Sequence, residues 1–205
     1  MANNINIELK EYKQFKKNFE YVMPDITQKD GRLYCMDLPI HNEKGTFIGA
    51  CEKWIDIGYK INCSLSKLLS NLYPYEFDFK GFRLKSIESC FQALKFPDSE
   101  IQKLVFNYWG VNAYHLQGAS SYNWKESGML YWQGQQMDRN SKEYEDFVDE
   151  LYISAIQNPF YRQSLKNADR LLIHSIGKLS KTETVLTRYE YEQQINCLSC
   201  FLKRR

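Results

Sequence analysis

A central amphipathic helix is predicted by the stretch Ser86-Ile87-Glu88-Ser89-Cys90-Phe91-Gln92-Ala93-Leu94-Lys95-Phe96. The spacing i, i+4, i+7 puts Glu88, Gln92 and Lys95 on one face of this helix, and the same spacing forms an apolar stripe beside them. The stripe consists of Ile87, Phe91 and Leu94. It would anchor the helix and hold a carboxylate, an amide and an amine at the edge of the core. An acid and an amine in such a place can shift each other's pKa, as in many catalytic sites.

A purely structural role fits the same spacing. Ser86 is a suitable N-cap, and Glu88 would then lie in the first turn, where the helix macrodipole favours an acid. Glu88 and Lys95 are two turns apart, so both side chains could lie in solvent. The case for chemistry at this helix therefore depends on the rest of the chain.

Further helices are predicted on both sides of this stretch. They occupy residues 3–20, 98–108, 141–155, a segment that begins at Pro159, and a last segment that begins at Thr187. The helix at 98–108 is expected to bury Ile101, Leu104, Val105 and Tyr108. The next helix, capped by Asn140 or Ser141, is expected to bury Tyr144, Phe147, Val148, Leu151, Tyr152 and Ala155. The last opens with a capping box formed by Thr187 and Glu190 and is expected to bury Tyr191, Ile195, Leu198 and Leu202.

Short strands are predicted where β-formers stand between glycine and asparagine turns. They lie at residues 31–37, 45–51, 54–59 and 171–176, with a turn at 78–81. Residues 110–134 contain four glycines and predict a long irregular segment. Together these patterns predict one predominantly helical α+β domain with a few short strands.

Composition restricts the class of protein. The chain has 205 residues, enough to bury a substantial core, and its net charge of +2 gives no argument for nucleic acid. No apolar run approaches the roughly 20 residues of a membrane span. The first residues lack the basic start and apolar core of a secretory signal, so a cytoplasmic location with reduced cysteines is expected. The basic end at residues 203–205 is expected to be a solvated tail.

The cysteines and histidines predict no metal site. Cys197 and Cys200 form a lone CxxC, and a zinc site needs about two more ligands with suitable spacing. The three histidines are widely separated, and nothing in the sequence calls for a cofactor.

Several motifs resemble the NADAR superfamily, which includes N-glycosidases of riboflavin-biosynthesis intermediates. One is the loop Leu69-Ser70-Asn71-Leu72-Tyr73-Pro74, which precedes the helix at 86–96. The others lie in the second half of the chain: Trp132-Gln133-Gly134 with Asp138-Arg139, then His174-Ser175-Ile176-Gly177, then Glu183-Thr184-Val185-Leu186-Thr187. The resemblance covers roughly residues 66–200. It divides the chain into residues 1–60, a helix and strands that match no family, and a NADAR-like domain at 61–205.

The resemblance implies a hydrolase that cleaves an N-glycosidic bond to ribose, with ADP-ribose on a guanine base as the expected substrate. The partner would be the ADP-ribosylated base, carried by nucleic acid or by a small molecule, with no membrane involved. Two alternatives stay open: an N-glycosidase of riboflavin-biosynthesis intermediates, and a non-catalytic module that binds ADP-ribose or NAD.

Under this resemblance the catalytic residues would be Glu88, as charge or base, and Lys95, as an amine that forms a Schiff base with the opened sugar. Substrate contacts would come from Asn71, Gln92, Trp124, Trp132, Asp138, Arg139, His174, Ser175 and Gly177. Several of them have a structural alternative. The tryptophans would then pack the loop onto the core instead of stacking on a base, and Arg139 would pair with Asp138 or Glu143 instead of a phosphate.

Overall fold

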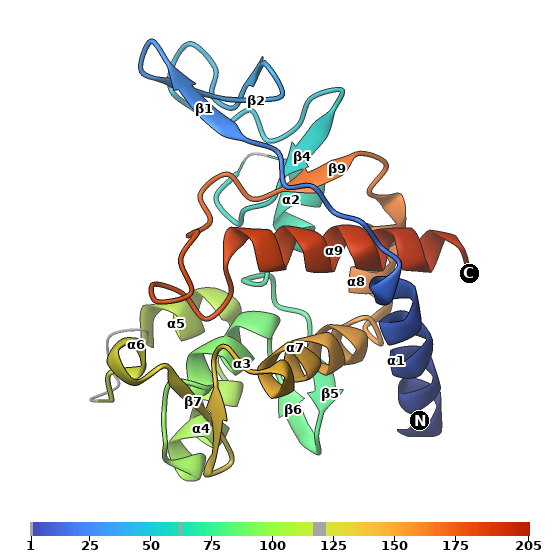
Figure 1. Ribbon diagram of the computed structural model, residues 1–205, viewed down its shortest axis with the longest axis vertical. Helices are drawn as coiled ribbons and strands as arrows, with labels where there is room; N and C mark the ends of the chain where they lie inside the picture. Colours follow the sequence, from blue (N-terminus) through green and yellow to red (C-terminus); the bar gives the residue numbers. More distant parts are fainter. Residues whose placement is uncertain (1, 62, 117–121) are drawn as a thin grey trace.

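A computed structural model describes residues 2–61, 63–116 and 122–205 and is an α+β structure (Figure 1). The helices are α1 (Ala2–Lys17), α2 (Ser64–Leu69), α3 (Ile87–Ala93), α4 (Ser99–Phe106), α5 (Gly110–His115), α6 (Trp124–Ser127), α7 (Lys142–Ala155), α8 (Pro159–Asn167) and α9 (Arg188–Lys203). The strands are β1 (Ile26–Lys29), β2 (Arg32–Cys35), β3 (Leu38–Pro39), β4 (Trp54–Asp56), β5 (Phe77–Phe79), β6 (Phe82–Leu84), β7 (Met129–Trp132), β8 (Gln135–Asp138) and β9 (Leu171–Ile173). Within these described residues, no helix has the length and apolar content needed to cross a membrane.

The helices form two groups, one around α3 and one around α9. The short helix α3 contacts α4, α5 and α7, while the long helix α9 contacts α8, α1 and β9 (Figure 1). Side-chain caps fix where several helices begin, as the sequence predicts: Ser86 caps α3, Ser141 caps α7, and Thr187 with Glu190 forms the capping box of α9. Each cap satisfies backbone N–H groups that would otherwise lack a partner.

The strands form four small sheets among the described residues. Three are antiparallel: β1-β2-β3, the β5–β6 hairpin and the β7–β8 hairpin. The fourth pairs β4 with β9 in parallel, so that Trp54 lies opposite Leu171. This last pairing joins segments that are far apart in the sequence, and it ties the N-terminal part of the chain to the segment that leads into α9.

Two apolar cores lie behind these elements. The larger is built mainly from α3, α7 and α9, and Tyr12 of α1 is fully buried in it. The smaller lies beneath β1-β2-β3 and contains Cys35, Ile40, Trp54 and Ile173. Residues on both sides of position 60 thus share each core. The expected division of the chain at residue 60 stays a prediction.

The predicted faces of α7 and α9 are confirmed, but the predicted face of α4 is wrong. Val105 is buried, whereas Ile101, Leu104 and Tyr108 are exposed. The buried residues are instead Gln102, Val105 and Phe106. Gln102 is fully buried because its amide donates to the carbonyls of Phe96 and Tyr131, and hydropathy patterns do not register a satisfied polar side chain.

Other local predictions also fail. The segment 110–134 is not irregular throughout, because it contains α5, α6 and β7, although residues 117–121 lie outside the described ranges. In residues 45–51, Phe47 and Ala50 form isolated bridges instead of a strand, and no sequence pattern predicted α2. The basic end is not a solvated tail: the Arg205 guanidinium pairs with Glu8 at 2.9 Å and with Glu11 at 3.2 Å.

Candidate functional site

Three polar side chains of the α3 segment form a hydrogen-bonded chain. The Gln92 amide donates to the Glu88 carboxylate at 2.6 Å, and the Lys95 amine donates to the Gln92 carbonyl oxygen at 2.8 Å. Both links follow from the helical spacing, since i, i+4 and i+3 neighbours lie on one face. The single amide of Gln92 therefore connects an acid to an amine, as the sequence predicts for the shared face.

Burial shifts both ionisable ends of this chain toward their neutral forms. Burial raises the pKa of Glu88, and the hydrogen bond from Gln92 and the charge of Lys95 oppose that rise only in part. Burial also lowers the pKa of Lys95, which is only 9% exposed, and the nearby charge of Lys125 lowers it further. Shifts toward the neutral form are typical of buried ionisable groups and are frequent at functional sites.

The turn before α3 brings Asn71 to the same place. The backbone N–H of Glu88 donates to the Asn71 carbonyl at 3.0 Å. Two buried tyrosines hold this turn: the Tyr152 hydroxyl donates to the Asn71 side-chain oxygen at 2.8 Å, and the Tyr191 hydroxyl donates to the Leu69 carbonyl at 2.8 Å. Sequence reasoning assigned both tyrosines to the core alone, because their positions on apolar helix faces gave no sign of a polar contact.

His174 and Ser175 lie in a neighbouring group of buried polar residues at the end of β9. The Ser175 backbone N–H and hydroxyl donate to the Asp56 carboxylate at 2.9 and 2.6 Å. The His174 Nδ1 donates to the Ile57 carbonyl at 2.7 Å. The His174 and Tyr191 rings are nearly perpendicular, with their centroids 5.1 Å apart. Burial lowers the pKa of His174, although this hydrogen bond opposes the shift. Tyr191 therefore connects this group to the turn at Asn71.

Gly177 closes the turn after Ser175. A Cβ at this position would lie 2.8 Å from the Arg188 Cβ and 2.8 Å from the His174 ring, so the close packing requires glycine. The Gly177 N–H donates to the His174 carbonyl at 2.9 Å and is thus already occupied.

Arg139 and Asp138 lie outside this group. The Arg139 guanidinium is 1% exposed and bonds to both oxygens of Glu190, at 3.0 and 2.5 Å. The partner of Arg139 is thus neither Asp138 nor Glu143. The ion pair with Glu190 leaves little of the guanidinium for a phosphate. Asp138 is exposed and accepts the backbone N–H of Asn140 at 2.8 Å.

The two candidate tryptophans take part in packing. Trp132 lies among four phenylalanine rings with centroids 5.2 to 5.8 Å away: Phe79, Phe82, Phe106 and Phe147. Trp124 is 7% exposed and belongs to the larger core. These contacts match the packing alternative, and a role in stacking on a base stays a prediction.

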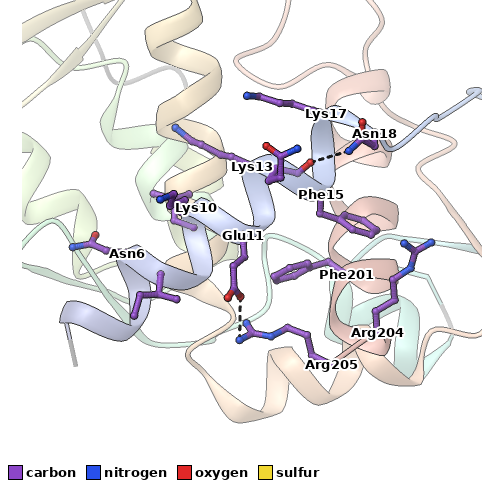
Figure 2. A pocket seen from close by; sticks show the side chains of 13 residues that line it. Asn6, Lys10, Glu11, Lys13, Phe15, Lys17, Asn18, Phe201, Arg204 and Arg205 are labelled. Atoms are coloured by element: carbon purple, nitrogen blue, oxygen red, sulfur yellow. Dashed lines mark hydrogen bonds and ion pairs between the residues drawn. The ribbon is translucent and has the colours of Figure 1, made fainter.

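Among the hollows on the described surface are a larger and a smaller one. The larger, about 1110 Å³, is an open groove between α1 and the end of α9, with Phe15 and Phe201 between basic side chains (Figure 2). The smaller, about 360 Å³, is lined by Tyr59, Leu72, Pro74, Trp109 and Val111. Leu72, which lines the smaller hollow, directly follows Asn71, so this hollow lies next to the turn that contacts Glu88.

The described residues contain no cluster of three or more histidine, cysteine, aspartate or glutamate side chains that would hold a metal ion. The six cysteines, all in the described ranges, are free; Cys197 is buried and Cys200 is exposed on α9.

Comparison with known families overturns the assignment to the NADAR superfamily. Residues 63–199 match the family model of bacteriophage protein GP30.3, and the NADAR superfamily gives no match. The motifs that suggested NADAR are short, and several of their residues, such as Trp132, Arg139 and Thr187, have packing, ion-pair or capping contacts within this structure. Searches of curated proteins and of solved structures found no significant match.

Proposed function

The chain belongs to the family of bacteriophage protein GP30.3, and we propose that it is a hydrolase of N-glycosidic bonds to ribose, with Glu88, Gln92 and Lys95 as its reacting group. The hydrogen-bonded chain of these three side chains at the edge of the core is the observation that supports the proposal. Cleaving a bond at ribose C1 needs negative charge or a base near C1 and a group that handles protons. Glu88 on α3 and Lys95, two residues beyond the end of α3, would supply these groups.

In the proposed reaction the neutral Lys95 amine attacks C1, and the bond between C1 and the base nitrogen breaks with its electron pair on the nitrogen. The amine gives one proton to that nitrogen and its other proton to the ring oxygen as the ring opens, which leaves an imine between Lys95 and C1. Water then adds to the imine carbon, the Glu88 carboxylate passes the two protons of the water in turn to the Lys95 nitrogen, and the C1–N bond breaks to give the sugar carbonyl and the neutral amine. Gln92 holds the acid and the amine at fixed positions relative to each other.

Within this reaction class we propose ADP-ribose on guanine as the substrate and the cytoplasm as the location. The Lys125 amine lies close enough to influence the pKa of Lys95, so it offers positive charge to a diphosphate beside the reacting group. Six free cysteines suit a reducing compartment.

The first experiment measures by mass spectrometry the release of ADP-ribose from an oligonucleotide that carries ADP-ribosylated guanine. The wild type is compared with Glu88→Gln, and Glu100→Gln on the exposed side of α4 serves as the matched control. Release by the wild type and the control, but not by Glu88→Gln, is expected. Equal release by all three would remove Glu88 from the mechanism.

If neither the wild type nor any variant releases ADP-ribose, the wild type is tested on a panel of small N-ribosides that includes riboflavin-biosynthesis intermediates. Turnover in that panel would keep the reaction class and change the substrate. Calorimetric binding of ADP-ribose without turnover of any substrate would favour a binding module.

A second experiment tests Lys95. Borohydride added during turnover reduces an imine to a stable amine, so a covalent sugar adduct on Lys95 is expected. An adduct that persists in Lys95→Ala, or the absence of any adduct during active turnover, would contradict the Schiff-base step.

A further inference from the structure

The hollow of about 360 Å³ beside Asn71 is lined by three separate segments of the chain. Tyr59 follows β4, Leu72 and Pro74 follow the Asn71 turn, and Trp109 and Val111 come from the start of α5. Each of these segments also contacts the candidate site. The carbonyl of Ile57, two residues before Tyr59, bonds to His174, Asn71 bonds to the Glu88 backbone, and α5 packs against α3.

Two aromatic side chains give this hollow its chemical character. Tyr59 is 36% exposed and Trp109 is 41% exposed, so both rings keep open surface. The Lys85 amine lies 5.0 Å from the centre of the Trp109 ring and helps to fix its position. The remaining wall is apolar, from Leu72, Pro74 and Val111.

The wall at Leu72 is fixed by an unusually close contact. A Cβ on Gly110 would lie 2.2 Å from the Leu72 carbonyl oxygen, so the backbones of α5 and the Asn71 turn pack together with no room for a side chain at position 110. The relative position of Trp109 and Leu72 is therefore set by backbone packing. A preformed apolar hollow with aromatic walls is the usual form of a small-ligand site.

We propose that this hollow binds the planar heterocyclic base of the ribosyl substrate, with the base held against Trp109 and Tyr59. The inference rests on the proposed function, and it adds two specificity residues that the sequence motifs do not contain. A planar ring fits because aromatic side chains stack on any base, while the polar residues near Glu88 would face the sugar.

The test uses the full chain with Glu88→Gln, so that ligands are bound without being consumed. Binding of guanosine 5′-monophosphate, ADP-ribose and ribose 5-phosphate is measured by calorimetry. The two ligands with a base are expected to bind, and ribose 5-phosphate much more weakly. Adding Trp109→Ala should weaken the base-containing ligands about 5- to 150-fold, the range that corresponds to stacking on one ring.

Further variants separate stacking from general damage. Trp109→Phe should restore binding to within a few-fold of the parent, because a phenyl ring still stacks. Tyr189→Ala removes an exposed aromatic ring on α9, outside the candidate site, and should leave binding unchanged. Circular dichroism of each variant verifies that the protein is folded.

Three results would overturn the inference: no binding of either base-containing ligand, equal binding of ribose 5-phosphate, or undiminished binding after Trp109→Ala in a folded protein. The proposed function fails differently. Trp109-dependent binding with no turnover by the wild type would retain the base site and remove the hydrolase, whereas turnover that is unaffected by Trp109→Ala would do the reverse.

Discussion

The Arg139 guanidinium forms a two-bond ion pair with the Glu190 carboxylate, at 3.0 and 2.5 Å. Glu190 also accepts the backbone N–H and the hydroxyl of Thr187, at 2.7 and 2.8 Å. One carboxylate therefore caps α9 and ties it to the residue that follows the β7–β8 hairpin. Burial alone would raise the pKa of Glu190, but the hydrogen bond and charge of Arg139 and the bonds from Thr187 outweigh burial and lower it.

Replacing Arg139 with methionine is expected to reduce the free energy of unfolding by about 3 kcal/mol at pH 7. This is the low end of the range for breaking a buried ion pair, because Glu190 keeps partial exposure and its Thr187 donors. Urea unfolding measures the loss. Lys142→Met, which breaks an exposed pair with Glu145, is the control and should cost less than about 1 kcal/mol. A loss at Arg139 no larger than the control would show that the pair contributes little.

The pair also predicts a pH dependence. The folded pKa of Glu190 lies below the unfolded value, so its contribution to stability is complete above the unfolded pKa, about 4.3, and is lost as pH falls through the folded pKa. The difference in stability between wild type and Glu190→Gln should therefore shrink when unfolding is measured at pH values descending below about 4. A difference that stays constant across this range would contradict the shift.

Sequence patterns predicted the parts of the fold that depend on local chemistry. The faces of α7 and α9 and the caps at Ser141 and Thr187 follow from helical periodicity and from capping residues. The parallel pairing of β4 with β9 depends on contacts between distant segments, and no local pattern specifies it. The face of α4 was missed because buried Gln102 is satisfied by carbonyls that lie elsewhere in the chain.

In the candidate site, too, local contacts were predicted from the sequence and contacts between distant segments were not. Helical spacing alone placed Glu88, Gln92 and Lys95 on one face, and the hydrogen bonds follow from it. The partners from other elements had no sequence signal: Tyr152 on Asn71, Asp56 on Ser175 and Glu190 on Arg139. Asn71, Ser175 and Arg139 belong to the short motifs that suggested NADAR. The match to the family of bacteriophage protein GP30.3 shows that these motifs alone led to the wrong family.

The shifted pKa of Glu88 predicts how activity depends on pH. Burial raises this pKa, and the proposed mechanism needs the ionised carboxylate. As pH is lowered, kcat/KM on an established N-riboside should therefore begin to decrease while the pH is still above the ordinary glutamate pKa of about 4.3. Because burial lowers the pKa of Lys95, the neutral amine should become available below the ordinary lysine value of about 10.4. The rate should therefore increase as pH rises through the shifted pKa of Glu88 and again through the shifted pKa of Lys95.

A pH–rate profile of the wild type measures both limbs. The matched control is Glu100→Gln, which should leave the profile unchanged. Loss of activity on the acid side only at or below pH 4.3 would contradict the proposed environment of Glu88. A decline in rate as the Lys95 amine loses its proton would identify Lys95 as a proton donor instead of a nucleophile.

Trp132 should contribute more to stability than Trp109. Its ring contacts Phe79 at 5.2 Å and Phe147 at 5.2 Å within the group of four phenylalanines. Trp132→Ala removes these contacts and leaves a cavity, so we expect the free energy of unfolding to fall by about 3–4 kcal/mol. Trp109→Ala, at a more exposed ring, should cost far less. Equal losses of stability would contradict the separate roles given to the two tryptophans.

Gly110 offers the sharpest test of backbone packing, because two effects predict opposite signs. Alanine in place of a helical glycine normally stabilises by up to about 1 kcal/mol. Here the new Cβ would lie 2.2 Å from the Leu72 carbonyl oxygen and 2.4 Å from the Leu72 Cα, and neither atom belongs to a side chain that can turn away. Gly110→Ala should therefore reduce the free energy of unfolding by about 2–3 kcal/mol, as overpacking does.

The control for this substitution is Gly128→Ala. Gly128 has a φ of 71° and open space around it, so alanine there brings backbone strain without a clash and should cost about 1–2 kcal/mol. The two variants should also differ at the hollow. Gly110→Ala pushes Leu72 away from α5 and should weaken binding of guanosine 5′-monophosphate in the Glu88→Gln background, whereas Gly128→Ala should leave that binding unchanged. A more stable Gly110→Ala protein would mean that α5 and the Asn71 turn are not in contact, and the wall at Leu72 would lose its basis.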